Sequence, residues 1–218
     1  MGMITSTIAR KVAMALSGLF LILFLGQHFT INMTSVFSEK TFNFLSHFMG
    51  NNPLVQFILQ PILIFGVVFH FILGFILQLK NNKSRNVKYI SYKGSANASW
   101  VSRNMILSGI VVLSFLGLHF YDFWVPEMNY KYVKFLPQDP ERYYEELVHK
   151  FHSPVRVSIY AVSFIFLSLH LFHGFASSFQ SVGLNNKYTR SIKLFTVAFS
   201  LVIPAGFIFI AIFHHLNG

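Results

Sequence analysis

Long apolar runs separated by short polar stretches dominate this chain. A helix needs about 20 apolar residues to cross a hydrocarbon core of roughly 30 Å, whereas a strand would need only about ten. Each run is long enough for a helix, and a spanning helix satisfies all of its backbone hydrogen bonds internally. The pattern therefore predicts five transmembrane helices, at Lys11 to Met33, Leu54 to Leu79, Val101 to Val125, Val155 to Phe179 and Ile192 to Phe213.

Two shorter helices are expected between the spans. The segment from Ser35 to Asn52 holds phenylalanines among polar residues, which suits a helix lying at the membrane interface. Glu141 to Lys150 predicts a short polar helix before the fourth span. The chain contains no linker-like segment, so we expect an all-α membrane protein made of a single five-helix transmembrane domain covering residues 1–218. The first apolar run is longer than a signal-peptide core, and we expect it to be retained as a span.

The charged residues predict an orientation across the membrane. Lysine and arginine gather before the first span, between Lys80 and Arg103, and between Lys187 and Lys193, three stretches that contain no acidic residue. A five-span topology puts all three on one side, and the positive-inside rule makes that side cytoplasmic. We therefore expect a cytoplasmic N-terminus and an external C-terminus. This distribution, rather than nucleic-acid binding, accounts for the net charge of +10.

The composition limits the chemistry. Hydrophobic residues make up 54% of the 218 residues and charged residues only 11%, far more apolar than a soluble domain of this size. The chain has no cysteine, which excludes disulfides, cysteine-ligated iron–sulfur clusters and covalent c-type haem. Any haem must be held by other side chains.

Four histidines, one in each of the first four spans, stand at matching positions. Each lies 16 or 17 residues after the start of its segment: His28, His70, His119 and His170. Because consecutive spans run in opposite directions, one offset gives two depths. His28 and His119 should lie near the outer face, and His70 and His170 near the inner face. An imidazole within a membrane usually has a partner or a functional role, and two levels with two histidines each suit two stacked haems.

Local sequence gives the same pairs. The first and third spans read Gly-x-His-Phe around His28 and His119, whereas the second and fourth carry a glycine four residues after the histidine, at Gly74 and Gly174. A glycine one turn away on the same helix face would let a flat porphyrin approach the backbone. Close helix packing is the alternative role for such glycines.

The four histidines are therefore predicted to bind haem iron as axial ligands of two b-type haems. Two histidines fill both axial positions of an iron, so these haems would carry electrons rather than bind oxygen or a substrate. His173, one turn after His170, is an alternative fourth ligand.

Motifs over nearly the whole chain carry a family resemblance. They are Arg10-Lys11-x-x-Met14-Ala15-x-Ser17-Gly18, His28-x-x-x-Asn32 and Ser168-Leu169-His170-Leu171-Phe172-His173-Gly174. With five spans and four ordered histidines, the chain resembles the single-polypeptide, di-haem cytochrome b subunit of succinate dehydrogenases and quinol:fumarate reductases.

The resemblance implies a non-catalytic electron-transfer subunit in a bacterial cytoplasmic (inner) membrane. It would anchor a flavoprotein subunit and an iron–sulfur subunit, and exchange electrons with a quinone, with menaquinone as the expected type. The basic segment from Lys80 to Arg103 suits docking of such partners, and equally the orientation signal alone. A quinone site also needs polar donors, for which Gln27, Asn32 and Asp122 are candidates. Helix capping or interfacial hydrogen bonding is the alternative role of these three.

Three alternatives stay open at this point. The first alternative is a quinol:fumarate reductase subunit. Some of these have a glutamate two residues before the fourth ligand, whereas this chain has Ser168, which favours the succinate-oxidising branch. The same haems could serve another dehydrogenase, such as a hydrogenase or a formate dehydrogenase. A haem-free transporter or anchor would use the histidines for a substrate or metal, and would have no need of two depth-matched pairs.

Overall fold

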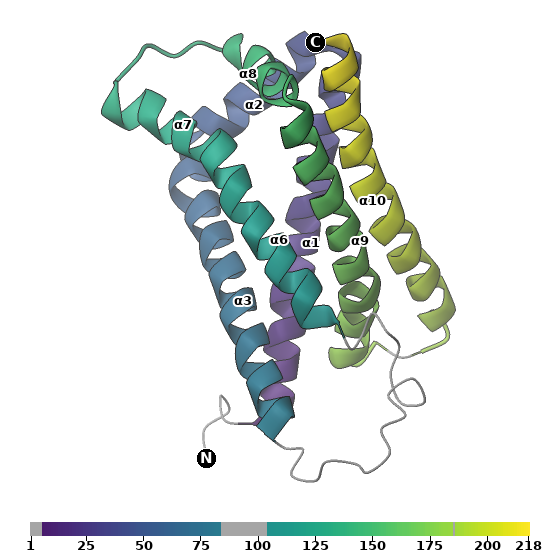
Figure 1. Cartoon of the computed structure of the whole chain (residues 1–218). Coiled ribbons are helices and arrows are strands. Elements are labelled where there is room, and N and C mark those ends of the chain that lie inside the picture. Colours follow the sequence, from purple (N-terminus) through teal and green to yellow (C-terminus); the bar gives the residue numbers. More distant parts are fainter. Residues whose placement is uncertain (1–5, 84–103, 185) are drawn as a thin grey trace.

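The computed structural model describes residues 6–83, 104–184 and 186–218, which form helices and no strand. Five helical segments in this part are long and apolar enough to cross a membrane, which confirms the five predicted spans: Thr7–Phe37, Val55–Asn81, Met105–Val133, Pro154–Ser181 and Thr189–Asn217. The first span begins at one end of the bundle and the C-terminus lies at the other end, which we call the upper end (Figure 1). The segment from 84 to 103, which holds most of the predicted basic loop, lies outside the described residues.

Four of the spans form a ring. They contain α1 (Thr7–Phe37), α3 (Gln60–Lys83), α6 (Met105–His119) and α9 (Pro154–Ser181). Close packing joins α1 to α3, α3 to α6, α6 to α9 and α9 back to α1. The fifth span, α10 (Thr189–Asn217), packs outside this ring against α9 and α1 (Figure 1). Consequently α1 and α6 are diagonal partners in the ring, and so are α3 and α9.

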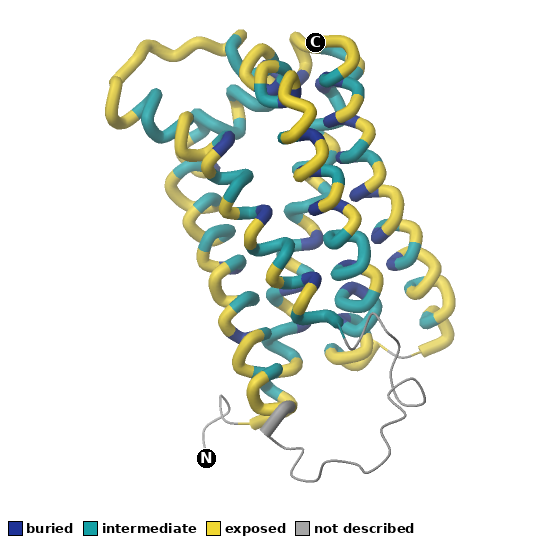
Figure 2. Tube along the Cα trace, viewed as in Figure 1, coloured by how far each residue is buried: buried dark blue, intermediate teal, exposed yellow. Residues whose placement is uncertain are grey.

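The exposed faces of the spans are apolar. Figure 2 shows continuous exposed stripes along the outside of the bundle, whereas the buried positions are scattered along its inner side. The exposed residues include Leu23, Phe65 and Leu194, each more than two-thirds exposed at 76%, 68% and 71%. Large apolar side chains in such numbers on the surface favour contact with lipid rather than water.

Two spans contain a short π-helical segment next to a proline. The segment η2 (Val55–Leu59) precedes α3, and η3 (Phe120–Trp124) follows α6. The amides of Gln60 and Val125 bond to carbonyls five residues earlier, at Val55 and Phe120. Pro61 and Pro126 stand immediately after these two amides, and proline has no N–H to continue the α-helical ladder. The third span continues through α7 (Val125–Met128) and η4 (Asn129–Val133).

Both predicted short helices are present at the upper end. They are α2 (Glu39–Asn51) and α8 (Arg142–Phe151), which pack against each other (Figure 1). The Ser38 side chain caps α2 by accepting a hydrogen bond from the Thr41 amide at 3.2 Å. Ser153 caps α9 in the same way, accepting from the Arg156 amide at 3.4 Å.

A cluster of ionic and aromatic groups, the upper clamp, joins these helices to the third span. Arg142 on α8 pairs with Glu127 on α7 and, at 2.6 Å, with Glu146. Its guanidinium also lies over the Tyr130 and Tyr143 rings, at 4.1 and 4.4 Å from their centroids. Burial disfavours the charge, but the hydrogen bonds and charges of the two carboxylates outweigh it and raise the pKa of Arg142. Lys131, 2.5 Å from Glu127, extends the clamp to α2 by donating to the Gly50 carbonyl at 2.6 Å.

Removing the arginine should loosen the upper end. We expect Arg142→Ala to lower the free energy of unfolding by about 2 kcal/mol, in the range of a hydrogen bond to a charged group. Arg142→Lys should recover only part of the loss, because an ammonium cannot reproduce the planar fork. Thermal unfolding of the purified protein in detergent measures the effect. Lys134→Ala, an exposed change between the third span and α8, is the control. Equal midpoints for Arg142→Ala and this control would contradict the expectation.

Candidate functional site

The four histidines of the first four spans meet in two pairs inside the ring. The His28 ring on α1 and the His119 ring at the end of α6 form the upper pair, with centroids 5.7 Å apart and planes at 83°. The His70 ring on α3 and the His170 ring on α9 form the lower pair, with centroids 6.4 Å apart and planes at 73°. The structure thus brings together the same partners that depth and local sequence indicated.

Each pair joins diagonal helices of the ring. The upper pair connects α1 with α6, and the lower pair connects α3 with α9. Neighbouring helices in a ring touch through their flanks, whereas residues on diagonal helices can meet only across its central axis. Both pairs therefore lie on the axis of the bundle, where side chains from facing helices can bind a cofactor.

The positions of two glycines show how far apart the two histidine pairs lie along the bundle axis. A Cβ atom added to Gly18 on α1 would lie 3.3 Å from His70 Cε1, and one added to Gly109 on α6 would lie 3.5 Å from His170 Cε1. The lower pair is therefore level with Gly18 and Gly109. Each glycine stands ten residues before the upper histidine of its own helix, so the two levels are about 15 Å apart at a rise of ~1.5 Å per residue.

Serine hydroxyls contact both rings of the lower pair. Ser17 Oγ lies 3.0 Å from His70 Nδ1, and Ser108 Oγ lies 3.4 Å from His170 Nδ1. Each hydroxyl also donates its hydrogen to the backbone carbonyl three residues earlier, at 3.0 Å to Met14 and 2.9 Å to Met105. A hydroxyl has a single hydrogen, so we infer that the Nδ1–H groups point toward the serine oxygens. The Met105 carbonyl also accepts a hydrogen bond from His170. Nε2 of each ring is then unprotonated and free to bind a metal.

Aromatic side chains surround the upper pair. Phe24 and Phe207 pack on the His28 ring, with centroids 5.4 and 5.8 Å from it. The His119 ring contacts Phe115 at 5.8 Å and Phe123 at 5.2 Å. His119 Nδ1 is buried without a hydrogen-bond partner in the structure. The surroundings of His119 are therefore apolar and aromatic, without a polar group on Nδ1.

The geometry fits two axial haem ligands at each level. Imidazoles on opposite sides of one metal, with metal–nitrogen bonds of about 2 Å, place their ring centroids roughly 6 Å apart. The observed separations of 5.7 and 6.4 Å agree with this value. Within the described residues, no group of three or more His, Asp or Glu side chains could hold a bare metal ion. A haem iron needs only two protein ligands, because the porphyrin supplies the others.

Gly74 and Gly174, the two glycines expected beside the porphyrin, face methionines. A Cβ at Gly74 would lie 3.2 Å from Met14 Cε, and one at Gly174 would lie 3.0 Å from Met105 Cε. Methionine is flexible and fills irregular gaps, so these contacts fit close packing of α1 on α3 and of α6 on α9. The glycines that face the histidine rings are Gly18 and Gly109.

The three polar residues considered for a quinone have different surroundings. Gln27 is exposed and its amide lies 3.5 Å from Met49 Sδ on α2. Asn32 donates from Nδ2 to the His28 carbonyl at 2.8 Å. Asp122 is buried, accepts a hydrogen bond from the Tyr160 hydroxyl at 2.8 Å and pairs with Arg156 at 3.2 Å. The Tyr160 ring in turn lies 6.4 Å from the His119 ring.

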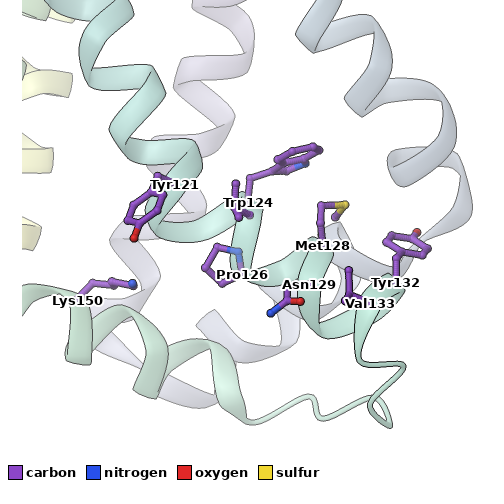
Figure 3. A pocket seen from close by; sticks show the side chains of 9 residues that line it. Tyr121, Trp124, Pro126, Met128, Asn129, Tyr132, Val133 and Lys150 are labelled. Atoms are coloured by element: carbon purple, nitrogen blue, oxygen red, sulfur yellow. The ribbon is translucent and has the colours of Figure 1, made fainter.

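A pocket of about 590 Å³ lies on the third span above His119 and reaches to α8. Tyr121 and Lys150 lie on one side of it and Tyr132 on the other (Figure 3). The lining is mainly apolar and aromatic, with a few hydrogen-bond donors: Tyr121, Trp124, Val125, Pro126, Met128, Asn129, Tyr132, Val133 and Lys150. Such a lining suits a flat ring with carbonyl acceptors.

Three histidines outside the two pairs differ in burial and in their contacts. The lower pair forms with His170, while His173, one turn further, is only partly buried. His214, near the end of α10, is buried, and its Nε2 lies 2.8 Å from Ser35 Oγ on α1. That contact joins α10 to the ring. His215 Nδ1 donates to the Phe151 carbonyl at 2.9 Å and so joins α10 to α8.

A repeated motif could have revealed the serines of the lower pair. Met14-Ala15-Leu16-Ser17-Gly18 on α1 matches Met105-Ile106-Leu107-Ser108-Gly109 on α6. The two copies are 91 residues apart, the same spacing as His28 and His119. In each copy the serine and the glycine face a histidine of the lower pair. The serines and glycines of this motif are therefore part of the candidate site, together with the histidines.

Comparisons with known proteins add no family assignment to this geometry. The chain matches no protein-family model, no curated protein and no solved structure.

Proposed function

We propose that this protein is the membrane subunit of a respiratory dehydrogenase and carries electrons through two haem b groups. His28 and His119 would hold the upper haem, and His70 and His170 the lower one. The observation that supports this most strongly is the pair of histidine contacts across the diagonals of the helix ring, at 5.7 and 6.4 Å. Two such contacts at two levels have no simple role in helix packing, which neighbouring helices already provide.

The residues around each pair favour electron transfer over ligand binding. Two histidines leave no axial position open, and when bound the haems supply one-electron oxidation and reduction. Aromatic rings pack around the upper pair and serine hydroxyls orient the lower one. The levels are about 15 Å apart along the bundle axis, a separation that extends over about half of a hydrocarbon core of roughly 30 Å.

We further propose that the complex is a succinate:quinone oxidoreductase. The sequence resemblance to di-haem cytochrome b subunits supports this assignment, and the partners would be a flavoprotein and an iron–sulfur subunit. Ser168 stands where some fumarate reductases carry a glutamate, and here it donates to the Ser200 carbonyl at 2.7 Å, joining α9 to α10. A packing serine at this position favours the succinate-oxidising branch.

The quinone, proposed to be menaquinone, would react at the upper end. With a cytoplasmic N-terminus, as the positive-inside rule predicts, the upper end faces outward. Asp122 is occupied by Tyr160 and Arg156, which favours an indirect role for that carboxylate. The pocket above His119 offers the hydroxyl of Tyr121 and the ammonium of Lys150 as donors.

An optical spectrum tests the proposal. We expect the purified protein to show a reduced-minus-oxidised spectrum of b type, and pyridine haemochrome quantification to give two haems per chain. A colourless, well-folded preparation would contradict the proposal and favour a haem-free transporter or anchor. Co-purification then separates the partners, because a hydrogenase or formate dehydrogenase in place of the two succinate dehydrogenase subunits would overturn the assignment of the complex alone.

A further inference from the structure

The two histidine pairs differ in what their Nδ1 atoms contact. In the lower pair, Ser17 Oγ lies 3.0 Å from His70 Nδ1 and Ser108 Oγ lies 3.4 Å from His170 Nδ1, which places an acceptor beside each Nδ1. The Met105 carbonyl is a second acceptor for His170. In the upper pair His119 Nδ1 has no hydrogen-bond partner. His28 has Asn32 Nδ2 at 3.4 Å from its ring nitrogens. That atom also donates to the His28 carbonyl, which identifies it as nitrogen, a donor and not an acceptor.

A hydrogen-bond acceptor beside Nδ1 changes the basicity of Nε2 in the same imidazole ring. When Nδ1–H donates a hydrogen bond, the imidazole becomes a more basic ligand at Nε2. A more basic axial ligand stabilises the higher oxidation state of the iron it binds, and hydrogen bonding to the ligands is one of the ways a protein sets a haem potential. The upper pair lacks this contribution.

We propose that Ser17 and Ser108 are positioning residues that hold the lower pair in one tautomer and selectively lower the reduction potential of the lower haem. This inference rests on the proposed function, since it requires haem at the lower level. The backbone bonds to the Met14 and Met105 carbonyls direct each hydroxyl oxygen toward its ring. Because Ser17 is the closer of the two, it should have the larger effect.

Each half of the chain contributes one serine to this arrangement. Ser17 on α1 serves His70 on the next span, and Ser108 on α6 serves His170 on the span after it. Each copy of the Met-x-x-Ser-Gly motif thus places a serine oxygen beside one histidine of the lower pair, and the second copy adds the Met105 carbonyl at His170. Their effects should therefore act in the same direction on one haem, and the double variant should show the largest shift.

A potentiometric titration of the full chain in its membrane complex, followed optically, tests the inference. In Ser17→Ala and Ser108→Ala we expect two haems per chain, one midpoint potential raised and the other unchanged. Ser17→Thr keeps a hydroxyl and should restore the original potential. Ser114→Ala is the matched control, because Ser114 on α6 makes the same kind of bond, to the Ile110 carbonyl at 3.0 Å, from an exposed position.

The possible negative results distinguish failure of this inference from failure of the proposed function. Unchanged potentials in both alanine variants, with both haems retained, would overturn the inference and leave the proposed function intact. If Ser17→Thr behaved like Ser17→Ala, the hydroxyl would not be the cause, and the inference would also fail. If Ser17→Ala loses the lower haem, Ser108→Ala, with its longer contact, decides the direction of the shift. Absence of haem in the unmodified protein would instead overturn the proposed function.

Discussion

His28→Ala and His119→Ala are expected to abolish the same haem, and His70→Ala and His170→Ala the other one. Each substitution removes one of two axial ligands and leaves an open position facing an apolar interior, so the affected haem should be lost from the purified protein. The levels are about 15 Å apart, and the second haem should stay bound. Haem quantification should fall from two to one per chain, and a redox titration should show which of the two remains.

Haem content in double variants tests which histidines share a haem. Because the members of one pair act on a single haem, His28→Ala combined with His119→Ala should lose no more haem than either change alone. Combining His28→Ala with His70→Ala should remove both haems. His173→Ala is the control and should retain two. If His28→Ala and His119→Ala left different haems behind, the pairing across α1 and α6 would be wrong.

The spans and the depth of the histidines follow from the sequence for a physical reason. A segment in lipid must bond its own backbone and must be long enough to cross, so length and hydropathy are sufficient to predict five helices. Because consecutive spans run in opposite directions, histidines at the same position within each span lie at two depths. The observed contacts of His28 with His119 and of His70 with His170 agree with those levels.

The rotation of each helix about its own axis could not be predicted in the same way. In a span that is apolar on every side, periodicity does not show which face points inward. The sequence predicts Gly74 and Gly174 at the porphyrin face. The structure shows in addition that Gly18 and Gly109 lie beside the histidine rings, which the apolar pattern does not indicate. The burial of His214 against Ser35 has the same origin, since it depends on how α10 packs on α1.

A large side chain at Gly109 should remove the lower haem. A methyl group there would already lie 3.5 Å from His170 Cε1, so the branched side chain in Gly109→Leu must push the ring away from its partner. Tightly packed interiors tolerate added volume poorly. We expect one haem per chain, and a remaining midpoint potential equal to that of His170→Ala. Gly18→Leu should lose the same haem, because its Cβ would approach the partner ring of His70 at 3.3 Å.

Gly117→Leu is the matched control for this effect. Gly117 stands two turns further along α6, and a Cβ atom there meets nothing within 4 Å. Both substitutions replace glycine by leucine in a helix, so both should gain a similar amount of helix propensity, and only the space beside the ring differs. Gly117→Leu should keep two haems. Loss of haem from Gly117→Leu, or two haems in Gly109→Leu, would show that the lower site is not built around Gly109 and His170.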